Sequence, residues 1–535
     1  MSERTNISIL ITLLCLWSCV KKEGQTTRES SAATRPNIIF IMADDHAEKA
    51  ISAYGHDLIE TPNIDRLAKE GMLFRNSFVT NSICAPSRAA ILTGKFSHIN
   101  GKRDNLDVFD GDQETFPKLL RRAGYTTAMI GKWHLKSTPQ GFDEWNILIG
   151  QGNYYSPRFV SGSDTTRVDG YVTDVITDYV LDFLNRRDTK QPFCLFYHHK
   201  APHRNWMPNV SDLHLYADEN LPLPANFFDQ YNNRQAAEAA DMRIADMFLS
   251  ADMKLMPDDY DSESGTGGND HYDAERAWKA NYNRMNEKQR EAWDAHYMPL
   301  NKAFAESKLT GKELAEWKYQ RYMKDYLRCI KSVDDNVGRV LGHLDKSGLA
   351  ENTIVVYTSD QGFYLGEHGW YDKRFMYEES MRTPLIVRYP KEIKAGTVAK
   401  QLVQNIDHAA TFLDFAGIDI PGEVQGKSLR PVMLDPDHAP FREALYYHYY
   451  EGLKGWHSVK KHYGVRTERY KLIHFYHDID TWELYDLKND SEEMNNLYNT
   501  EGYRDIREDL HQKLKKLKIK YTDIDSNKTK VYNRE

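Results

Sequence analysis

Residues 81–95 read NSICAPSRAAILTGK, and from Cys84 to Arg88 they form the pattern C-x-P-S-R. Four fixed residue types at set spacing arise by chance only on the order of once per thousand such chains, given average residue usage. Pro86 suits the first turn of a helix, so we expect a helix over 87–94 whose positive end faces Cys84. With the charge of Arg88, this predicts a site for an anion with several oxygens. A buried free cysteine beside a capping serine would explain the thiol alone.

The composition is that of a globular protein without strong net charge. The 535 residues are enough for one large and one small domain with a substantial core. Lys and Arg number 70 against 78 Asp and Glu, and no basic run is long enough for a nucleic-acid-binding face. We therefore expect no nucleic-acid partner, and recognition of an anionic substrate must be local.

The N-terminus has the pattern of a secretion signal. After a short polar start, the apolar run over 7–17 is too short to span a bilayer, and a small residue and Cys19 follow it. Residues 1–18 resemble a bacterial lipoprotein signal peptide, which implies lipidation of Cys19; a plain signal peptide is the alternative. Residues 19–35 are polar and are predicted to be a tether. We expect a bacterial cell-envelope protein, periplasmic or surface-exposed, that meets the membrane through its lipid anchor only.

Apolar runs alternate with helical patterns over most of the chain. The run over 37–42, NIIFIM, is typical of a strand buried on both faces of a parallel sheet. Further strand-like runs lie at 126–130, 193–197, 353–358 and 385–388, and helical patterns at 64–70, 116–123 and 174–185. The alternation predicts an α/β domain over 36–430, with a mostly parallel sheet flanked by helices. The polar, helix-prone segment over 208–324 is interpreted as a helical insertion.

The pattern changes after residue 430. Shorter strand-like pieces occur at 444–449, 462–467, 470–476 and 482–486, and a charged helical segment follows at 504–518. We interpret residues 431–522 as a smaller C-terminal domain with an antiparallel sheet and a helix, and residues 523–535 as a tail.

Two pairs of oxygen-bearing side chains directly follow apolar strand runs, namely Asp44-Asp45 and Asp360-Gln361. Adjacent strands of one parallel sheet would bring the pairs together at the edge where such sheets bind ligands. Oxygen ligands without Cys or His favour a hard cation such as Ca²⁺. A solvated turn or a helix cap would explain either pair alone, but the repetition predicts a metal site.

Three further motifs carry basic side chains that could reach one anion. A lysine and a histidine two positions apart on an extended segment face the same side. Each of these residue types, taken singly, is most often an ordinary surface residue. The motifs are GYTTAMIGKWH (124–134) with Lys132 and His134, YHHKAPH (197–203) with Lys200 and His203, and YDKRFMYE (371–378) with Lys373.

Together these motifs resemble the signatures of the type I sulfatases: C-x-P-S-R, then G-Y-x-T with G-K-x-H, then K-A-P-H. The resemblance extends to the closing segment WELYDLKNDSEEMNNL at 482–497. It implies an alkaline-phosphatase-like fold, and conversion of Cys84 to Cα-formylglycine by a formylglycine-generating maturation enzyme. It also implies one divalent ion, usually calcium, whose ligands would be Asp44, Asp45, Asp360 and Gln361. Asn or His is also common at the position of Gln361.

The resemblance further implies a role for each basic residue. The hydrated aldehyde at position 84, held by Arg88, would attack the sulfur of a sulfate ester, and His203 would protonate the departing sugar oxygen. His134 would then act as the base that expels sulfate from the covalent intermediate, so that water never attacks sulfur directly. The sulfate-binding residues would be Lys132, Lys200 and Lys373, of which Lys373 would also assist the leaving group.

A lipid-anchored enzyme of this kind would meet sulfated polysaccharides, algal or host, and their oligosaccharides. The chain resembles bacterial polysaccharide sulfatases, among them N-acetylglucosamine-6-sulfatases and enzymes for ulvan. Candidates for holding the sugar are His457, His462, Arg466 and the tyrosines near Tyr154. Two alternatives stay open: a phosphate- or phosphonate-ester hydrolase of the same superfamily, and a surface glycan-binding lipoprotein with a dead site.

Overall fold

The computed structural model describes residues 35–260, 273–452 and 456–524. The predicted signal peptide, Cys19, most of the tether and most of the tail lie outside these residues. The described part contains a large sheet in the order β11-β2-β10-β9-β1-β8-β4-β5-β6-β7. In chain order its strands are β1 (Asn37–Ala43), β2 (Met72–Phe74), β4 (Thr126–Gly131), β5 (Glu144–Leu148), β6 (Arg158–Ser161), β7 (Asp164–Arg167), β8 (Phe193–His198), β9 (Thr353–Ser359), β10 (Leu385–Arg388) and β11 (Thr397–Ala399).

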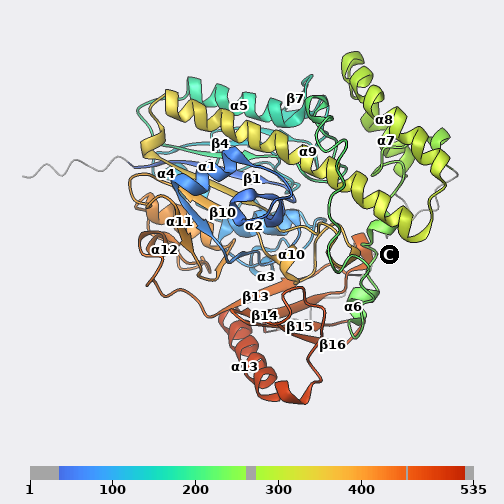
Figure 1. Cartoon of the computed structure of the whole chain (residues 1–535). Coiled ribbons are helices and arrows are strands. Elements are labelled where there is room, and N and C mark those ends of the chain that lie inside the picture. The colour runs from blue at the N-terminus through green and yellow to red at the C-terminus, as the bar shows by residue number, and fades with distance from the viewer. Residues whose placement is uncertain (1–34, 261–272, 453–455, 525–535) are drawn as a thin grey trace, which may run out of the picture. The chain divides into compact units, whose positions relative to one another are not determined.

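β1 lies in the middle of this sheet, and helices bury both of its faces. Ile39 and Ile41 join one core while Ile38 and Phe40 join the other, because successive side chains of a strand point to opposite faces. This arrangement confirms the predicted α/β class with helices on both sides (Figure 1). The first core is covered by α1 (Pro62–Glu70), α5 (Val172–Arg186) and α9 (Gly311–Lys346), and the second by α2 (Cys84–Thr93), α4 (Phe116–Arg122), α11 (Asp407–Phe415) and α12 (Arg430–Leu434).

The sheet is mostly parallel, with antiparallel pairs toward its edges. β1 runs parallel to both of its neighbours, β8 and β9, whereas β10 runs antiparallel to β9 and β2. β6 and β7 extend the opposite edge in antiparallel pairs. The sequence does not predict β2, β5, β6, β7 or β11, because strands this short carry few apolar residues and every residue of β7 is exposed. A separate two-stranded sheet pairs β3 (Ser77–Phe78) with β12 (Val403–Gln404).

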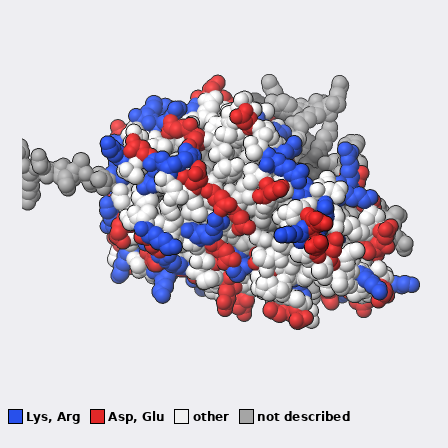
Figure 2. All heavy atoms as spheres, turned by 90° about the horizontal axis from the view of Figure 1, so that it is seen from above, with Lys and Arg blue, Asp and Glu red and all other residues white. Residues whose placement is uncertain are grey.

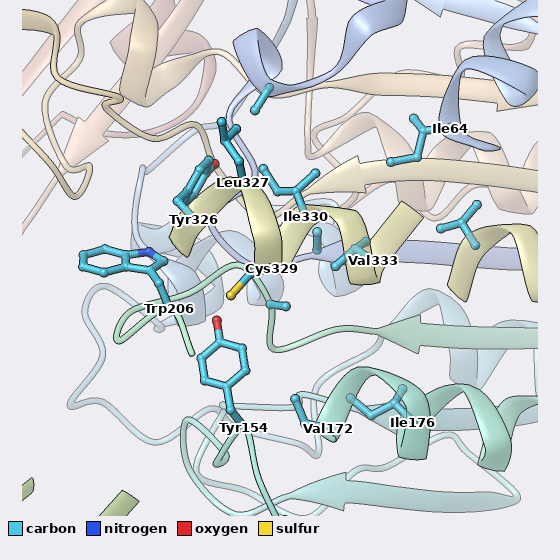
Figure 3. Packing of buried hydrophobic residues seen from close by; sticks show 14 of the residues in the cluster. Ile64, Tyr154, Val172, Ile176, Trp206, Tyr326, Leu327, Cys329, Ile330 and Val333 are labelled. Carbon is cyan, nitrogen blue, oxygen red and sulfur yellow. The ribbon is translucent and has the colours of Figure 1, made fainter. Parts of the chain in front are cut away.

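The first core also holds a loop that reaches the functional site. Figure 3 shows Ile176 of α5 and Val333 of α9 in one layer, and Tyr154 pointing its hydroxyl group toward the sulfur of Cys329. Tyr154 and Cys329 are both almost fully buried. Close packing of this kind fixes the Tyr154 ring, which lines the cavity described below.

Between β8 and β9 the described chain forms helices and loops but no strand, as predicted for an insertion. The predicted end at residue 324 is wrong, because that residue lies inside α9. The apolar residues Leu327, Ile330 and Val333 continue the helical spacing beyond it. None of the described helices is both long and apolar enough to cross a membrane. The other helices of the insertion are α6 (Gln235–Glu238), α7 (Ala274–Tyr282) and α8 (Glu287–Ser307).

The C-terminal part forms a four-stranded antiparallel sheet with one long helix, as the sequence predicts. One face of the sheet packs on α13 through Leu510 and Leu514, and the other packs on Trp370 and Phe375 of the large domain. The boundary at residues 430 and 431 stays a prediction. The elements are β13 (Ala444–Tyr449), β14 (His462–Thr467), β15 (Tyr470–Phe475), β16 (Thr481–Asp486) and α13 (Arg504–Lys520), and two short helices of the large domain are α3 (Ser97–Asn100) and α10 (Glu378–Met381).

Acidic and basic side chains are interspersed on the face of the molecule in Figure 2. A surface of mixed sign exerts little long-range attraction on a polyanion. This face therefore offers a polyanion little long-range attraction.

Candidate active site

The two acidic pairs meet at the carboxyl edge of the large sheet. Ala43 and Ser359 are register partners on β1 and β9, so Asp44 and Asp360 follow at the same level. Carboxylate oxygens of Asp44, Asp45 and Asp360 all lie within 4.8 Å of one another. Both Asp44 Oδ1 and Gln361 Oε1 are buried without a hydrogen-bond partner. Oxygen donors that are buried and lack a proton donor are what a hard cation requires, so these residues fit a Ca²⁺ site.

Three cations face the three carboxylates of this cluster, yet burial still raises the pKa of two of the carboxylates. Lys132 donates to Asp44 Oδ2, Arg88 Nη2 lies 2.8 Å from Asp360 Oδ2, and Lys373 Nζ lies 2.7 Å from Asp45 Oδ2. Burial would raise the pKa of Asp44, but Lys132, His203 and Arg88 hold it well below its usual value. Burial raises the pKa of Asp45 to about 6 and that of Asp360 to about 7. Further positive charge would let all three carboxylates ionise together.

Cys84 is itself the first residue of α2, so the helix starts before the predicted position at Ser87. Its Sγ lies within 4.8 Å of an Asp44 oxygen and a His203 nitrogen. The helix has no side-chain cap from Ile83, but Asn105 Oδ1 accepts the N–H of Ala85 at 3.1 Å. Burial raises the pKa of the Cys84 thiol. An unmodified thiol here would be neutral and a poor nucleophile, although its position at the helix N-terminus is suitable for reaction with an anion.

Lys132 and His134 follow the end of β4. Gly131 has φ 105°, and a Cβ there would lie 1.9 Å from the carbonyl oxygen of His198, so only glycine allows this approach. Lys132 is fully buried and bonds to Gln151 Oε1 as well as to Asp44. The prediction that Lys132 and His134 share one face of an extended segment is wrong, because the backbone at His134 is left-handed with φ 59°.

His134 does not line the cavity described below, and its Nδ1 is buried without a hydrogen-bond partner. Burial, reinforced by Lys132, lowers the pKa of His134 well below its usual value. The ring is therefore neutral, which is the form a base requires.

Lys200 and His203 lie beyond the end of β8. The Lys200 ammonium group lies 4.5 Å from the centre of the Tyr154 ring, and burial lowers the pKa of Lys200 to about 8. His203 Nδ1 donates to the carbonyl of Arg204 at 2.8 Å, so Nε2 faces the site, 3.7 Å from Asp45 Oδ2. Tyr154 fixes the same turn by donating to the carbonyl of His203 at 2.6 Å. His203 thus presents one nitrogen to the cavity, as a proton donor or acceptor would.

A cavity of about 290 Å³ opens above these residues. Cys84, Lys200, His203 and Lys373 line the part of the cavity next to the acidic cluster, which we call the inner end. We call the linked lining residues Asp372, Arg374 and His457 the outer polar cluster, and their part of the cavity the outer end. Amides from several loops form the remaining wall. The lining residues are Cys84, Asn105, Gln151, Gly152, Asn153, Tyr154, Lys200, His203, Arg204, Asn205, Met207, Asn281, Asp372, Lys373, Arg374 and His457.

The outer polar cluster is linked by its own contacts. Asp372 Oδ2 lies 3.1 Å from His457 Nε2, and Asp372 Oδ1 lies 3.2 Å from Arg374 Nε. The three residues have φ values of 75°, 99° and 68° in the order Asp372, Arg374, His457. Left-handed backbone at non-glycine residues costs energy and is concentrated at functional sites. Burial would raise the pKa of Asp372, but Lys373, Arg374 and His457 hold it well below its usual value, so it remains a carboxylate.

Two of the predicted sugar-binding residues lie away from the cavity. His462 is fully buried in β14, where its ring stacks on Phe375, so it belongs to the core of the small sheet. Arg466 Nη2 pairs with Glu378 Oε2 at 3.0 Å and does not line the cavity either. His462 is therefore enclosed by the core, whereas Arg466 lines a different cavity together with Glu378 and Arg382, and its role stays a prediction. His457 and Tyr154 do line the cavity.

Sequence reasoning missed several residues that line the site. Asp372 and Arg374 flank Lys373, and the run Asp-Lys-Arg was the available signal. Gln151 and Asn105 lie in loops with no motif, and nothing in their local sequence marks them. Their roles become visible only from their contacts with Lys132 and with the first turn of α2.

Comparisons with known proteins extend this geometry. A family model described as "Sulfatase" matches residues 36–418, and one described as "N-sulphoglucosamine sulphohydrolase, C-terminal" matches residues 366–520. The N-acetylglucosamine-6-O-sulfatase of Bacteroides thetaiotaomicron is 48% identical over 530 residues, covering 98% of this chain and 92% of that protein. An ulvan-active sulfatase of Formosa agariphila is 24% identical, covering 91% of this chain and 81% of that protein.

A solved structure of a complex with the substrate D-glucosamine-2-N,6-O-disulfate is also similar. It has 50% sequence identity and a TM-score of 0.88, and the match covers 93% of this chain and 100% of that one.

Proposed function

The chain belongs to the sulfatase family and is a sulfuric ester hydrolase acting on sulfated glycans, and on that premise we propose that it removes the 6-O-sulfate of a terminal N-substituted glucosamine residue. The observation that carries this proposal is one small cavity with a cationic inner end and a polar outer end that contains a carboxylate, a guanidinium group and an imidazole. The cavity is at the lower limit of the roughly 300–1,000 Å³ typical of small-molecule sites. One sulfated sugar ring would fill it.

We further propose that the mature site contains formylglycine at position 84 and one Ca²⁺. The ligands would be the oxygens of Asp44, Asp45, Asp360 and Gln361, two of which are buried without a partner. A formylglycine-generating enzyme would act on Cys84 before folding, because the folded chain buries that side chain. When present, the modified residue supplies a hydroxyl nucleophile and the ion supplies charge that stabilises sulfate oxygens.

The chain's own residues then have defined tasks. Arg88 holds Asp360 through two hydrogen bonds of 2.8 and 3.0 Å, which keeps the acidic cluster aligned with the helix that carries position 84. The cations Lys200 and Lys373 line the inner end and would balance the sulfate charge, while Lys132, which does not line the cavity, bonds to Asp44 and Gln151. In the reaction the bond between sulfur and the sugar oxygen breaks, and the sugar oxygen takes up a proton. The oxygen of water ends on sulfate.

His203 is the proposed proton donor to the sugar oxygen. It lines the cavity beside Lys373, and its Nδ1–H is tied to a backbone carbonyl, which directs Nε2 inward. Burial lowers the pKa of His203 well below its usual value, so Nε2 has to take up a second proton before it can donate one. The negative charge of a bound sulfate would favour that protonated form. His134 is the proposed base of the second half of the reaction, because burial and the charge of Lys132 keep its ring neutral. The two histidines would thus divide proton donation and proton acceptance between them.

The outer polar cluster is proposed to bind the sugar hydroxyls. Asp372 is the one carboxylate that lines the cavity among the described residues, and it can accept hydrogen bonds from two adjacent hydroxyl groups. Arg374 and His457 hold it in place: Arg374 Nε lies 3.2 Å from Oδ1, and His457 bonds to Oδ2 through Nε2 and to the Asp241 carbonyl through Nδ1. A ring held there through its free hydroxyls would be a chain end, which implies exo action.

The decisive experiment is a panel of defined substrates assayed with calcium present. We expect turnover of glucosamine 6-sulfate and its N-acetyl and N-sulfo forms, and at least about 100-fold lower kcat/KM for 3-O-sulfated glucosamine and galactose 6-sulfate. Aryl sulfate and aryl phosphate test the class of ester, and preference for phosphate would contradict the proposal. Equal turnover of all sugar sulfates would contradict the assigned position.

For the cell we propose a lipoprotein anchored through Cys19 in the bacterial envelope, at the periplasm or the cell surface. The support is the N-terminal sequence pattern, which lies outside the described residues. Mass spectrometry of the mature N-terminus tests it: an acylated Cys19 is expected, and an unmodified N-terminus at another residue would contradict it.

A further inference from the structure

The first strand of the small sheet contacts the segment that precedes α2, the helix that begins at Cys84. β13 is an edge strand, and the N–H of His448 bonds to the carbonyl of Thr80 at 3.0 Å, in the segment just before Cys84. Tyr447 and Tyr449 of β13, and Glu451 two residues past its end, all contact the loop that carries Arg374. Alternate residues of an extended chain point to the same side. We call these three residues the β13 brace.

Tyr447 connects this loop to the segment before position 84. Its hydroxyl donates to the carbonyl of Arg374 at 2.6 Å and accepts the N–H of Ser82 at 3.1 Å. The residue is fully buried, so no water competes for either bond. One hydroxyl therefore joins the outer polar cluster to the chain two residues before the nucleophile position.

Glu451 makes a second connection through its two carboxylate oxygens. Oε2 accepts from Arg374 Nη1 at 2.7 Å, and Oε1 accepts the N–H of Asn105 at 3.4 Å. The side chain of Asn105 in turn accepts the N–H of Ala85 in the first turn of α2. Tyr449 supports the carboxylate by donating to Oε2 at 3.2 Å. The Glu451 side chain is 9% exposed, so its bonds are largely shielded from solvent.

We infer that Glu451 is a positioning residue, which sets the distance between the sugar-binding Arg374 and the N-terminus of the catalytic helix. The inference rests on the proposed function, in which Arg374 binds the sugar. A carboxylate is required because both of its partners are donors: an amide in its place would direct its NH₂ group at either Arg374 or the Asn105 N–H. The small sheet thereby contributes to substrate selection without touching the substrate.

The test is Glu451→Gln in the mature, calcium-loaded enzyme. We expect KM for the sugar 6-sulfate to rise about tenfold with kcat changed less, because a charged hydrogen bond is lost outside the reacting centre. The ratio of kcat/KM for the sugar sulfate to that for an aryl sulfate should fall by the same factor. In the Arg374→Ala background Glu451→Gln should have little further effect, as expected if Glu451 acts through Arg374.

The matched control is Glu483→Gln. Glu483 is a buried carboxylate of the same sheet that accepts from Tyr377 and Tyr485 and does not line the cavity. Its substitution should leave the substrate ratio unchanged. If Glu451→Gln fails to fold, Tyr449→Phe removes one hydroxyl next to the same contact and should shift the ratio in the same direction by a smaller factor.

The outcomes separate the inference from the proposed function. The positioning role would be overturned if Glu451→Gln lowered kcat/KM equally for both substrates and also lowered the melting temperature. It would also be overturned if Glu451→Gln caused the same loss in the Arg374→Ala background as in the unmutated enzyme. If Arg374→Ala raises KM but neither Glu451→Gln nor Tyr449→Phe does, the inference fails and the proposed function stands. If Arg374→Ala leaves KM unchanged, the outer polar cluster does not bind the sugar and the proposed function itself fails.

Discussion

The two ends of the cavity are built in different ways. The inner end takes Cys84 from the start of α2, Lys200 and His203 from the turn after β8 and Lys373 from the loop that also carries Arg374. The acidic cluster that follows β1 and β9, on the edge of the large sheet, lies against these residues. The outer end consists of three residues with left-handed backbone, taken from a loop and from the C-terminal part, and held by side chains of a second sheet. Rigid strands suit a reacting centre that tolerates little displacement. Loops can change the sugar that is recognised while the chemistry is retained.

The largest effect is expected at the inner end, from Cys84→Ala. We expect kcat/KM to fall at least about 10⁴-fold, because the nucleophile is removed. Steady-state assay of the sugar 6-sulfate measures it, and mass spectrometry of the peptide around residue 84 in the unmutated enzyme should show the aldehyde. Full activity with an unmodified thiol would remove the basis for contrasting the two ends.

Removal of calcium should have the next largest effect on activity, and this effect should arise at the inner end alone. Chelation is expected to lower activity by at least about 100-fold and to lower the melting temperature, since an ion bound only by the folded state stabilises it. Asp45→Asn should abolish the increase in melting temperature on adding Ca²⁺. An increase of the same size in that variant would exclude Asp45 as a ligand.

At the outer end, Arg374→Ala tests sugar recognition. We expect KM for the sugar 6-sulfate to rise roughly 10- to 100-fold, as for the loss of charged hydrogen bonds, with a smaller change for an aryl sulfate. Equal losses on both substrates would mean that the outer residues serve the chemistry, and the contrast between the ends would not hold.

The smallest effect concerns the charge of Lys200. Burial lowers the pKa of Lys200 to about 8, so its positive charge is present below that pH and lost above it. KM for the sulfated substrate should therefore rise above pH 8, by less than about tenfold for one of several cations. Lys200→Arg keeps its charge and should flatten the rise. The same rise in that variant would assign it to another group.

The sequence predicts the inner end well and the outer end poorly, for a physical reason. Asp44 and Asp360 each directly follow a long apolar strand, and parallel neighbours bring such positions together whatever lies between them. Cys84 lies in a contiguous motif with helix-start chemistry. Arg374, by contrast, owes its position to Glu451 and Tyr447, which are more than seventy residues away and have no local pattern.

The misplaced residues follow the same rule. His462 and Arg466 lie in a strand whose apolar neighbours predict a sheet but not which face is covered, and both faces of this sheet are buried. The predicted end of the insertion is wrong because α9 continues through residue 324 as one helix from Gly311 to Lys346, with buried residues spaced along most of its length. Local patterns predict the elements, while the partner of each face depends on the whole fold.

The backbone bond between His448 and Thr80 has a consequence for engineering. A chimera that exchanged only the C-terminal part between relatives, in order to change specificity, would separate β13 from the segment at residues 80–82. These two segments are hydrogen-bonded to each other. To retain its selectivity, such a chimera would have to take residues 80–82 and the turn at Asn105 from the same relative as the C-terminal sheet.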